Sequence, residues 1–361
     1  MVATRAERGE PRAGNREART ECRASSAECG KTEDRGPGTG DGKVPVAGPR
    51  SSVSVDLSVD IAGIRMQNPV MTASGTFGYA REFEQYMDLN RLGALVVKTI
   101  SRHPRVGNPP PRVVETPAGM LNAIGLQNVG IEAFVREKLP YLRELRPPLI
   151  VNVAGESVED FHDLTKRLSD QEGVAGIELN ISCPNVAGGL DFSTDPRLAH
   201  RVVKAAREAT RLPVIPKLSP NVTDIVAIAR AVAEAGADAI SMINTLVGMA
   251  VDVRTRRPRI GNVTGGLSGP AIRPVAVRMV WQVARAVRLP VIGMGGIRSA
   301  EDALEFMISG ATGVAIGTAN FIDPTACVRV IEGLEDYCAE QGISDIHQLI
   351  GSLKIPGEET S

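Results

Sequence analysis

Residues 289–297 read LPVIGMGGI, residues 299–310 read SAEDALEFMISG, and residues 313–319 read GVAIGTA. The first and third pieces are short apolar runs with glycines near their ends, typical of buried strands. The middle piece predicts a helix, because Ser299 can cap its first turn with Asp302 at the third helical position, and Gly310 can end it. A strand, a helix and another buried strand in succession indicate a parallel sheet.

The same alternation of apolar strand and amphipathic helix repeats from residue 53 onward. In TDIVAIARAVAEAG (223–236), for example, Ile225, Ile228 and Val232 share one helical face, so this segment predicts a helix packed on a core. The strands are almost continuously apolar, which indicates parallel strands covered by helices. Eight are predicted, over residues 68–75, 93–99, 147–155, 176–182, 212–220, 237–245, 289–297 and 313–319.

Eight strand–helix repeats are the number that closes a (β/α)8 barrel. An open, doubly wound α/β sheet is the alternative, but its first strand is usually followed by GxGxxG, and TASGTFGYA (72–80) lacks that spacing. We therefore predict the α/β fold class, a (β/α)8 TIM barrel over residues 53–350. A disordered N-terminal extension (1–52) would precede it and a C-terminal tail (351–361) would follow.

Composition excludes several classes of protein. The chain is 43% hydrophobic and 23% charged with a net charge of -1, so no basic excess suggests general nucleic-acid binding. No apolar run approaches the roughly 18 residues that predict a transmembrane helix. Residues 1–52 are rich in Arg, Glu, Gly and Pro with isolated apolar residues, which predicts disorder.

The five cysteines, at positions 22, 29, 183, 327 and 338, show no CxxC spacing. We therefore predict neither a zinc site nor an iron–sulfur cluster, and no metal site of any kind. An odd cysteine count and the lack of an apolar signal segment at the N-terminus favour a reducing, cytoplasmic location.

Active sites of (β/α)8 barrels lie at the C-terminal ends of the strands. In this chain every predicted strand delivers polar groups or glycine to that rim, and this coincidence indicates a functional site more strongly than any one residue does. These rim residues are Ser74, Lys98, Thr99, Asn152, Asn180, Cys183, Lys217, Asn244, Thr245, Gly295, Gly296, Gly317 and Thr318.

The rim residues suggest three kinds of contact. Glycines that end the seventh and eighth strands can bind a phosphate through exposed backbone N–H groups, or can simply form tight turns. Lys98 and Lys217 can form a Schiff base, face a cofactor ring or a carboxylate, or extend to solvent. Carboxamides suit a planar imide or amide substrate, or can fix turns; they are Asn122, Asn152, Asn180, Asn185 and Asn244.

Cys183 belongs to GIELNISCPN (176–185), between a strand end and the glycine-rich stretch NVAGGLDFSTDP (185–196). With no neighbouring histidine it is a poor acyl-transfer nucleophile, but a thiol of lowered pKa beneath a mobile loop can act as a general base. A buried structural cysteine is the alternative. On these residues alone, a Schiff-base aldolase, a sugar-phosphate isomerase and a non-enzymatic flavin- or phosphate-binding scaffold stay open.

Six motifs resemble those of the dihydroorotate dehydrogenases, and the resemblance covers residues 54–345. They are NAIGLQN (122–128), NISCPN (180–185), KLSPN (217–221), INT (243–245), GMGGI (293–297) and IGTA (316–319). Cysteine rather than serine in NISCPN resembles class 1, the soluble class, and NAIGLQN is most similar to the class 1B catalytic subunit. The resemblance implies FMN-dependent oxidation of (S)-dihydroorotate to orotate in pyrimidine (UMP) biosynthesis.

It also implies residue roles. Cys183 would take the C5 proton as general base while the C6 hydride passes to flavin N5. FMN would contact Ser74, Thr99, Asn152, Asn180, Lys217, Ile243, Gly269, Gly295, Gly296, Gly317 and Thr318. Substrate would contact Lys98, Asn122, Ala123, Ile124, Gly125, Leu126, Asn180, Asn185, Asn244 and Thr245.

Class 1B enzymes pass electrons to NAD through a partner subunit that carries FAD and a [2Fe–2S] cluster. This chain has neither a nucleotide-binding GxGxxG nor cluster cysteines, so it would need such a partner, around a homodimer core in a heterotetramer. Fumarate, the acceptor of class 1A, is the alternative, because class 1A lacks both features as well. Neither nucleic acid nor a membrane is an expected partner.

Overall fold

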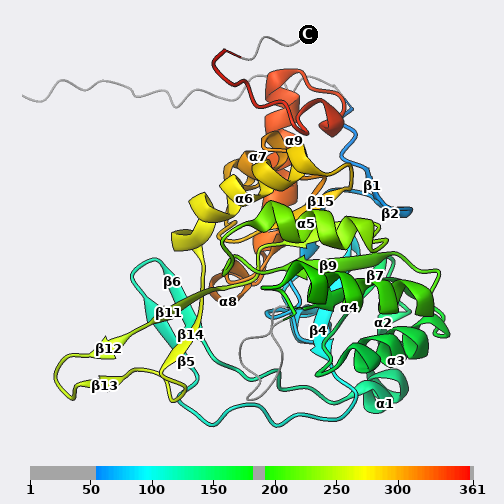
Figure 1. Ribbon diagram of the computed structural model, residues 1–361. Helices are drawn as coiled ribbons and strands as arrows, with labels where there is room; N and C mark the ends of the chain where they lie inside the picture. Colours follow the sequence, from blue (N-terminus) through cyan, green and yellow to red (C-terminus); the bar gives the residue numbers. More distant parts are fainter. Residues whose placement is uncertain (1–53, 182–191, 358–361) are drawn as a thin grey trace, which may run out of the picture. The chain divides into compact units, whose positions relative to one another are not determined.

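The computed structural model of the protein describes residues 54–181 and 192–357, and it confirms the predicted barrel (Figure 1). Eight parallel strands form one sheet in the order β3, β16, β15, β10, β9, β8, β7 and β4. Their bounds are β3 Val70–Thr72, β4 Leu95–Ile100, β7 Leu149–Val153, β8 Val174–Asn180, β9 Val214–Leu218, β10 Ile240–Met242, β15 Val291–Met294 and β16 Gly313–Ile316.

The two ends of this sheet, β3 and β4, meet and close the barrel. Met71 and Ala94 form a parallel bridge, and the backbone N–H of Gly93 donates to the carbonyl of Val70 at 2.8 Å. The Thr72 hydroxyl donates to the carbonyl of Val96 at 3.0 Å and accepts from the Val96 N–H at 2.9 Å. A side chain thus replaces part of the backbone ladder, so the buried polar groups of the seam are satisfied.

Helices cover the outer face of the barrel, and the sequence explains where they begin. Ser299 and Asp302 form the predicted capping box of α7, and Asp224 caps α5 by accepting from the N–H groups of Val226 and Ala227. The helices are α1 Ile131–Ala133, α2 Leu139–Leu142, α3 Val158–Ser169, α4 Pro196–Ala209, α5 Ile225–Glu234, α6 Arg273–Ala286, α7 Ala300–Ile308, α8 Ala319–Ile322 and α9 Ala326–Gln341. A π-helical stretch, Phe134–Lys138, joins α1 to α2, and short 3-10 helices span Arg81–Phe83, Leu89–Arg91, Pro270–Ile272 and Ile346–Gln348.

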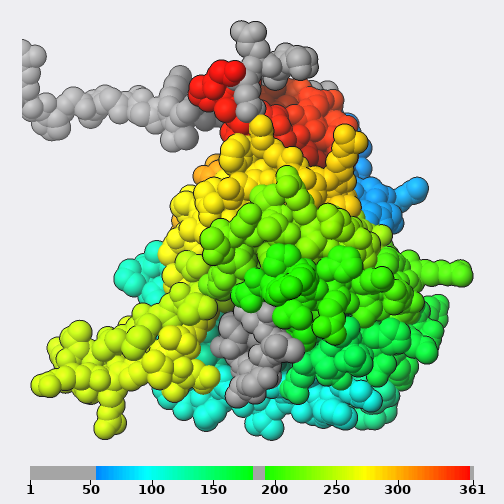
Figure 2. Space-filling model, in the orientation of Figure 1, coloured from blue at the N-terminus to red at the C-terminus, as the bar shows by residue number. Residues whose placement is uncertain are grey.

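A four-stranded antiparallel sheet that the sequence analysis did not predict adjoins the barrel. Its order is β11 Leu246–Met249, β14 Thr264–Ser268, β6 Gly119–Asn122 and β5 Val113–Thr116. Between β11 and β14, the strands β12 Val251–Asp252 and β13 Arg257–Pro258 form a separate two-stranded ribbon that projects from the surface (Figures 1 and 2). Because β6 ends at Asn122 and β11 begins just after Thr245, this sheet continues the carboxyl-end rim of the barrel. A further hairpin, β1 Val59–Ile61 with β2 Ile64–Met66, precedes β3.

The observed barrel strands are shorter than the predicted ones except β8, which has the predicted length but begins two residues earlier. Residues 237–245, for example, give a β10 of only Ile240–Met242, although the N–H of Asn244 still donates to the carbonyl of Leu218 on the neighbouring strand β9 at 2.9 Å. Residues 1–52 and 358–361 lie outside the described residues, so disorder of the extension stays a prediction. No helix in the described ranges has both the length and the apolarity needed to cross a bilayer.

Gly93 tests the closure of the barrel. A Cβ at this position would lie 2.1 Å from the carbonyl oxygen of Asn68 and 2.8 Å from that of Val70. Gly93→Ala should therefore lower the free energy of unfolding by about 1–3 kcal/mol or more, measured by chemical denaturation, because the seam must shift to accept a methyl group. Gly75→Ala is the matched control, because its Cβ would have no neighbour within 4 Å. A Gly93→Ala variant as stable as the control would contradict a tightly closed seam.

Candidate active site

A cavity of about 550 Å³ opens at the C-terminal ends of the barrel strands. Every barrel strand except β7 contributes lining residues from its last positions or from the loop that follows it. The antiparallel sheet supplies one wall, through residues of β5, β6 and β14. The cavity therefore lies where the sequence predicted the functional rim.

Nearly all of the predicted site residues within the described ranges line this cavity. They are Ser74, Lys98, Thr99, Asn122, Ile124, Gly125, Leu126, Asn180, Lys217, Ile243, Asn244, Thr245, Gly269, Gly295, Gly296, Gly317 and Thr318. Ala123 and Asn152 are fully buried and do not line the cavity, so their predicted contacts with substrate and FMN stay predictions. Ala123 packs with Leu121 and Ile260. The predicted base Cys183 and substrate contact Asn185 lie outside the described residues.

The floor of the cavity is polar and almost completely buried. Lys217 and Asn180 are paired in register across β9 and β8, and their side chains are only 6% and 9% exposed. The Lys217 ammonium donates to the Ser74 hydroxyl at 3.5 Å, and the Asn244 amide donates to Asn180 Oδ1 at 3.4 Å. Burying polar groups costs desolvation free energy, so a cluster of them in a cavity is typical of a binding site.

Lys98 brings a positive charge to the wall of the cavity. Burial lowers the pKa of Lys98, and the nearby charge of Arg112 lowers it further. Within the described residues, no carboxylate forms an ion pair with the Lys98 ammonium. The cavity therefore favours an anionic ligand, whose charge would offset both effects.

Glycines shape the side of the cavity between β15 and the 3-10 helix Pro270–Ile272. Gly295 and Gly296 have φ values of 129° and 86°, a backbone conformation that L side chains rarely adopt. A Cβ on Gly296 would lie 2.9 Å from the carbonyl oxygen of Gly269 and 3.2 Å from the backbone nitrogen of Arg273. The absence of side chains leaves backbone N–H groups accessible here, as an anion-binding loop requires.

Arg112 is the main cavity residue that the sequence analysis missed. It directly precedes β5, and its guanidinium donates to Gln127 Oε1 at 2.5 Å and to the carbonyl of Asn108 at 3.2 Å. The stretch RVVET (112–116) could have indicated it, because the β-branched residues Val113 and Val114 favour a strand close to the NAIGLQN motif. Other lining residues that were not predicted include Met120, Gln127, Ser268, Arg298, Phe321 and Ile322.

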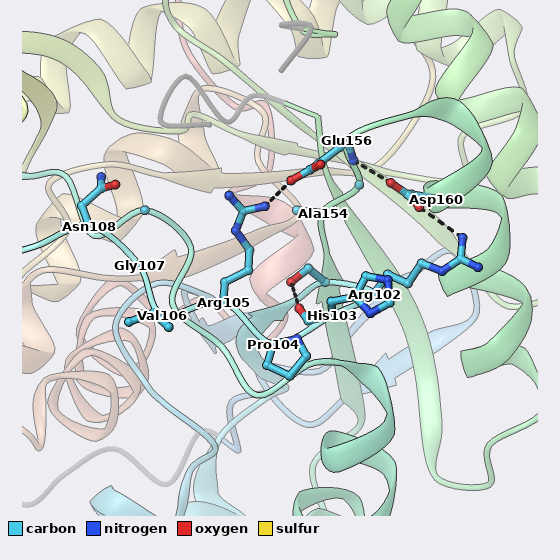
Figure 3. Close-up of a pocket in the computed structure, with 13 residues that line it drawn as sticks. Arg102, His103, Pro104, Arg105, Val106, Gly107, Asn108, Ala154, Glu156 and Asp160 are labelled. Carbon is cyan, nitrogen blue, oxygen red and sulfur yellow. Dashed lines mark hydrogen bonds and ion pairs between the residues drawn. The ribbon is translucent and has the colours of Figure 1, made fainter. Parts of the chain in front are cut away.

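A second hollow, of about 640 Å³, lies beside the loop that follows β4 (Figure 3). Its cations are already paired: Arg105 with Glu156, and Arg102 with Asp160 at 3.5 Å. Because carboxylates already neutralise these charges, the hollow should bind an anion less favourably than the strand-end cavity does. We therefore regard the strand-end cavity as the candidate active site.

Neither thiol in the described residues is suited to proton transfer. Cys327 and Cys338 are buried in α9, and burial raises the pKa of Cys327 to about 12 and also raises the pKa of Cys338. The described residues also contain no group of three or more His, Cys, Asp or Glu side chains placed to hold a metal ion.

Comparison with known proteins agrees with this geometry. The sequence profile of the family described as "Dihydroorotate dehydrogenase" matches residues 56–338. A relative from Geotalea uraniireducens is 60% identical over 299 residues, which are 82% of this chain and 98% of the relative. Relatives from Geotalea daltonii and Geobacter metallireducens are each 60% identical over 301 residues, covering 83% of this chain and 99% of the relative.

All three relatives are named "Dihydroorotate dehydrogenase B (NAD(+)), catalytic subunit". The range that the family profile matches includes all eight barrel strands. The chain belongs to the dihydroorotate dehydrogenase family.

Proposed function

We propose that this protein is the catalytic subunit of an NAD-linked dihydroorotate dehydrogenase, which oxidises (S)-dihydroorotate to orotate in pyrimidine biosynthesis. The observation that carries the proposal is the convergence of carboxamides, two lysines and glycine turns from separate strands on one cavity. The names of the relatives favour NAD as the final acceptor and do not favour fumarate.

Two features of the cavity fit FMN. The glycine turns leave space and backbone N–H groups for a phosphate, and the buried side chains of Lys217 and Asn180 line the cavity floor with polar groups. We assign the phosphate to the backbone of Gly295, Gly296, Gly317 and Thr318. The rest of FMN would contact Ser74, Thr99, Asn152, Asn180, Lys217, Ile243 and Gly269. When bound, FMN supplies a ring that accepts a hydride.

Dihydroorotate combines a ring of alternating N–H and C=O groups with a carboxylate. Asn122, Asn180 and Asn244 line the cavity, and together with Asn185 they would supply donors and acceptors to the ring. Lys98 would meet the carboxylate, because a buried ammonium gains most from an anionic partner. These contacts would orient the ring and exclude water from it.

Cys183 is the proposed general base: its Sγ would take the C5 proton of dihydroorotate. The two described thiols are unsuited to this role because burial raises the pKa of each. Electrons would then leave through a partner subunit that carries FAD and a [2Fe–2S] cluster, bound to a homodimer of this chain in the cytoplasm. Mixing the purified chain with dihydroorotate and NAD should give no NADH until that partner is added.

The decisive test of the activity is an anaerobic titration. The protein should purify with, or take up, FMN, and stoichiometric (S)-dihydroorotate should bleach the flavin absorption while orotate forms. Bound FMN that dihydroorotate fails to bleach would indicate a scaffold. A colourless protein that borohydride traps with a carbonyl substrate would indicate a Schiff-base enzyme instead.

Cys183 can be tested by two substitutions. Cys183→Ala should keep its FMN content but slow anaerobic flavin reduction by about 10²–10⁴-fold, because no base remains for the C5 proton. Cys183→Ser should retain some reduction that rises with pH, since a hydroxyl is a weaker base. Near-normal reduction in the alanine variant would remove Cys183 from the mechanism.

Removing the charge of Lys98 should stabilise the protein but weaken ligand binding. Lys98→Met should raise the free energy of unfolding of the FMN-free protein by about 0.5–2 kcal/mol, because it removes a desolvated charge. It should also weaken orotate binding by roughly 10–100-fold, since a charged hydrogen bond is lost. In the native protein, orotate affinity should fall as pH rises through the Lys98 pKa, which lies below the ordinary 10.5.

The matched control for this substitution is Lys204→Met, on the exposed face of α4. It should change neither stability nor orotate affinity appreciably. A Lys98→Met variant that binds orotate normally would contradict the assigned role of Lys98.

A further inference from the structure

Asp302 is a buried carboxyl group beside the turn of residues 295–298, which follows β15. All four residues of this turn line the strand-end cavity. Asp302 itself is 6% exposed and occupies the third position of α7, where it completes the capping box with Ser299. The proposed reaction gives this carboxylate no role.

Two backbone N–H groups at the end of the turn donate to Asp302. The N–H of Arg298 donates to its Oδ2 at 2.8 Å, and the N–H of Ser299 donates to the same oxygen at 3.2 Å. A capping box includes only the second of these contacts, because its reciprocal bond comes from the N-cap residue, here Ser299. The bond from Arg298 is therefore not part of the capping motif, and it holds the last residue of the cavity-lining turn.

An arginine from the neighbouring helix is paired with this carboxylate and also packs on the turn. Arg273, the first residue of α6, forms an ion pair with Asp302 through Nη1, and its Nε lies 3.1 Å from Glu305 Oε2. A Cβ on Gly296 would lie 2.8 Å from Arg273 Cβ and 3.2 Å from its backbone nitrogen. The turn is thus held between the start of α6 and the start of α7, and the ion pair joins the two helices.

A carboxylate bonded to an anion-binding turn would by itself oppose the anion. Like charges close together in a partly buried site disfavour each other. The Arg273 guanidinium offsets this repulsion, so the pair can hold the turn without opposing a bound anion. Backbone N–H groups bind a phosphate tightly only when the surrounding structure holds them toward its oxygens, and Asp302 and Arg273 give the turn support of this kind.

We propose that Asp302 is a positioning residue that, together with Arg273, holds the 295–298 turn in the conformation that binds the phosphate of FMN. The hydrogen bond from Arg298, which capping does not require, and the ion pair behind the turn carry this inference. It rests on the proposed function, because it requires FMN with its phosphate at this turn. It assigns part of the FMN affinity to a residue that does not line the cavity.

Asp302→Asn tests this role through the difference between FMN and riboflavin, which lacks the phosphate. Asparagine keeps the size of the side chain, but its single oxygen cannot face both the backbone N–H groups and the Arg273 guanidinium. The variant should bind FMN about 10–100-fold more weakly than the native FMN-free protein, in a flavin fluorescence titration, and its riboflavin affinity should change by less than about twofold. A purely electrostatic effect has the opposite sign, because removing a negative charge would strengthen phosphate binding.

Two controls assign the effect to the ion pair and the turn. Glu305→Gln removes the other carboxylate beside Arg273 but leaves the Asp302 contacts, so it should keep the ratio of FMN to riboflavin affinity nearly unchanged. In a double-mutant cycle, Asp302→Asn combined with Arg273→Met should bind FMN no more weakly than the weaker-binding single variant, because the same ion pair is lost in all three. Additive losses would contradict a joint role of Asp302 and Arg273.

The outcomes distinguish this inference from the proposed function. A native protein that binds no FMN, or whose FMN dihydroorotate does not reduce, would refute the proposed function. Native FMN binding with no loss in Asp302→Asn, or with equal losses for FMN and riboflavin, would overturn only the role of Asp302.

A second measurement applies if the asparagine variant fails to fold. In the native FMN-free protein, the Arg298 amide should already be protected from hydrogen exchange, and FMN should add little protection, because Asp302 holds the turn before the ligand binds. An Arg298 amide that becomes protected only when FMN binds would overturn the proposal.

Discussion

The hydrogen-bonded seam between β3 and β4 is the constraint on which the rest of the structure depends. Thr72, Gly93 and the Met71–Ala94 bridge join the two ends of an eight-stranded parallel sheet, and a parallel sheet that closes on itself must place all of its carboxyl ends on one rim. Residues as distant in sequence as Ser74 and Thr318 thereby come to line one cavity. Barrel closure therefore brings the residues of the candidate site together, and the loops after the strands add further lining residues.

The interior beneath that rim is less apolar than stability alone would favour. Lys98, Lys217 and Glu178 all lie within or under the cavity wall, where Lys217 and Glu178 are almost completely buried. A barrel can tolerate this cost because its remaining strand positions are filled by Val, Ile, Leu and Ala that are almost fully buried. The polar layer then provides fixed donors and acceptors that need little reorganisation when a ligand binds.

Much of the fold could be predicted because its signals are local. Each barrel strand is an apolar run, and each following helix shows a helical repeat of apolar residues and often a capping residue. Eight such strand–helix repeats predict a closed barrel, and the motif residues lie at the C-terminal ends of its strands. The antiparallel sheet was missed because β6 and β14 contain several glycines and pair across more than a hundred residues of chain. Arg112 was missed with it, since its place in the cavity depends on that sheet.

A long-range contact also explains why Asn152 does not line the cavity. Asn152 was predicted to line the cavity from its position at a strand end, but its amide is turned toward Glu178 on the next strand. A strand-end position specifies the level of a residue in the barrel, whereas its hydrogen-bond partner specifies the direction of its side chain. For Cys183 and Asn185, outside the described residues, the motif NISCPN carries the assignment.

The central claim is that FMN occupies the strand-end cavity, and the structure of a complex with FMN and orotate measures this most directly. The phosphate should bind to the backbone N–H groups of Gly295, Gly296, Gly317 and Thr318, with the flavin ring beside Lys217 and orotate beside Lys98. A phosphate bound instead among Arg102 and Arg105 in the second hollow, with the strand-end cavity empty, would contradict the assignment.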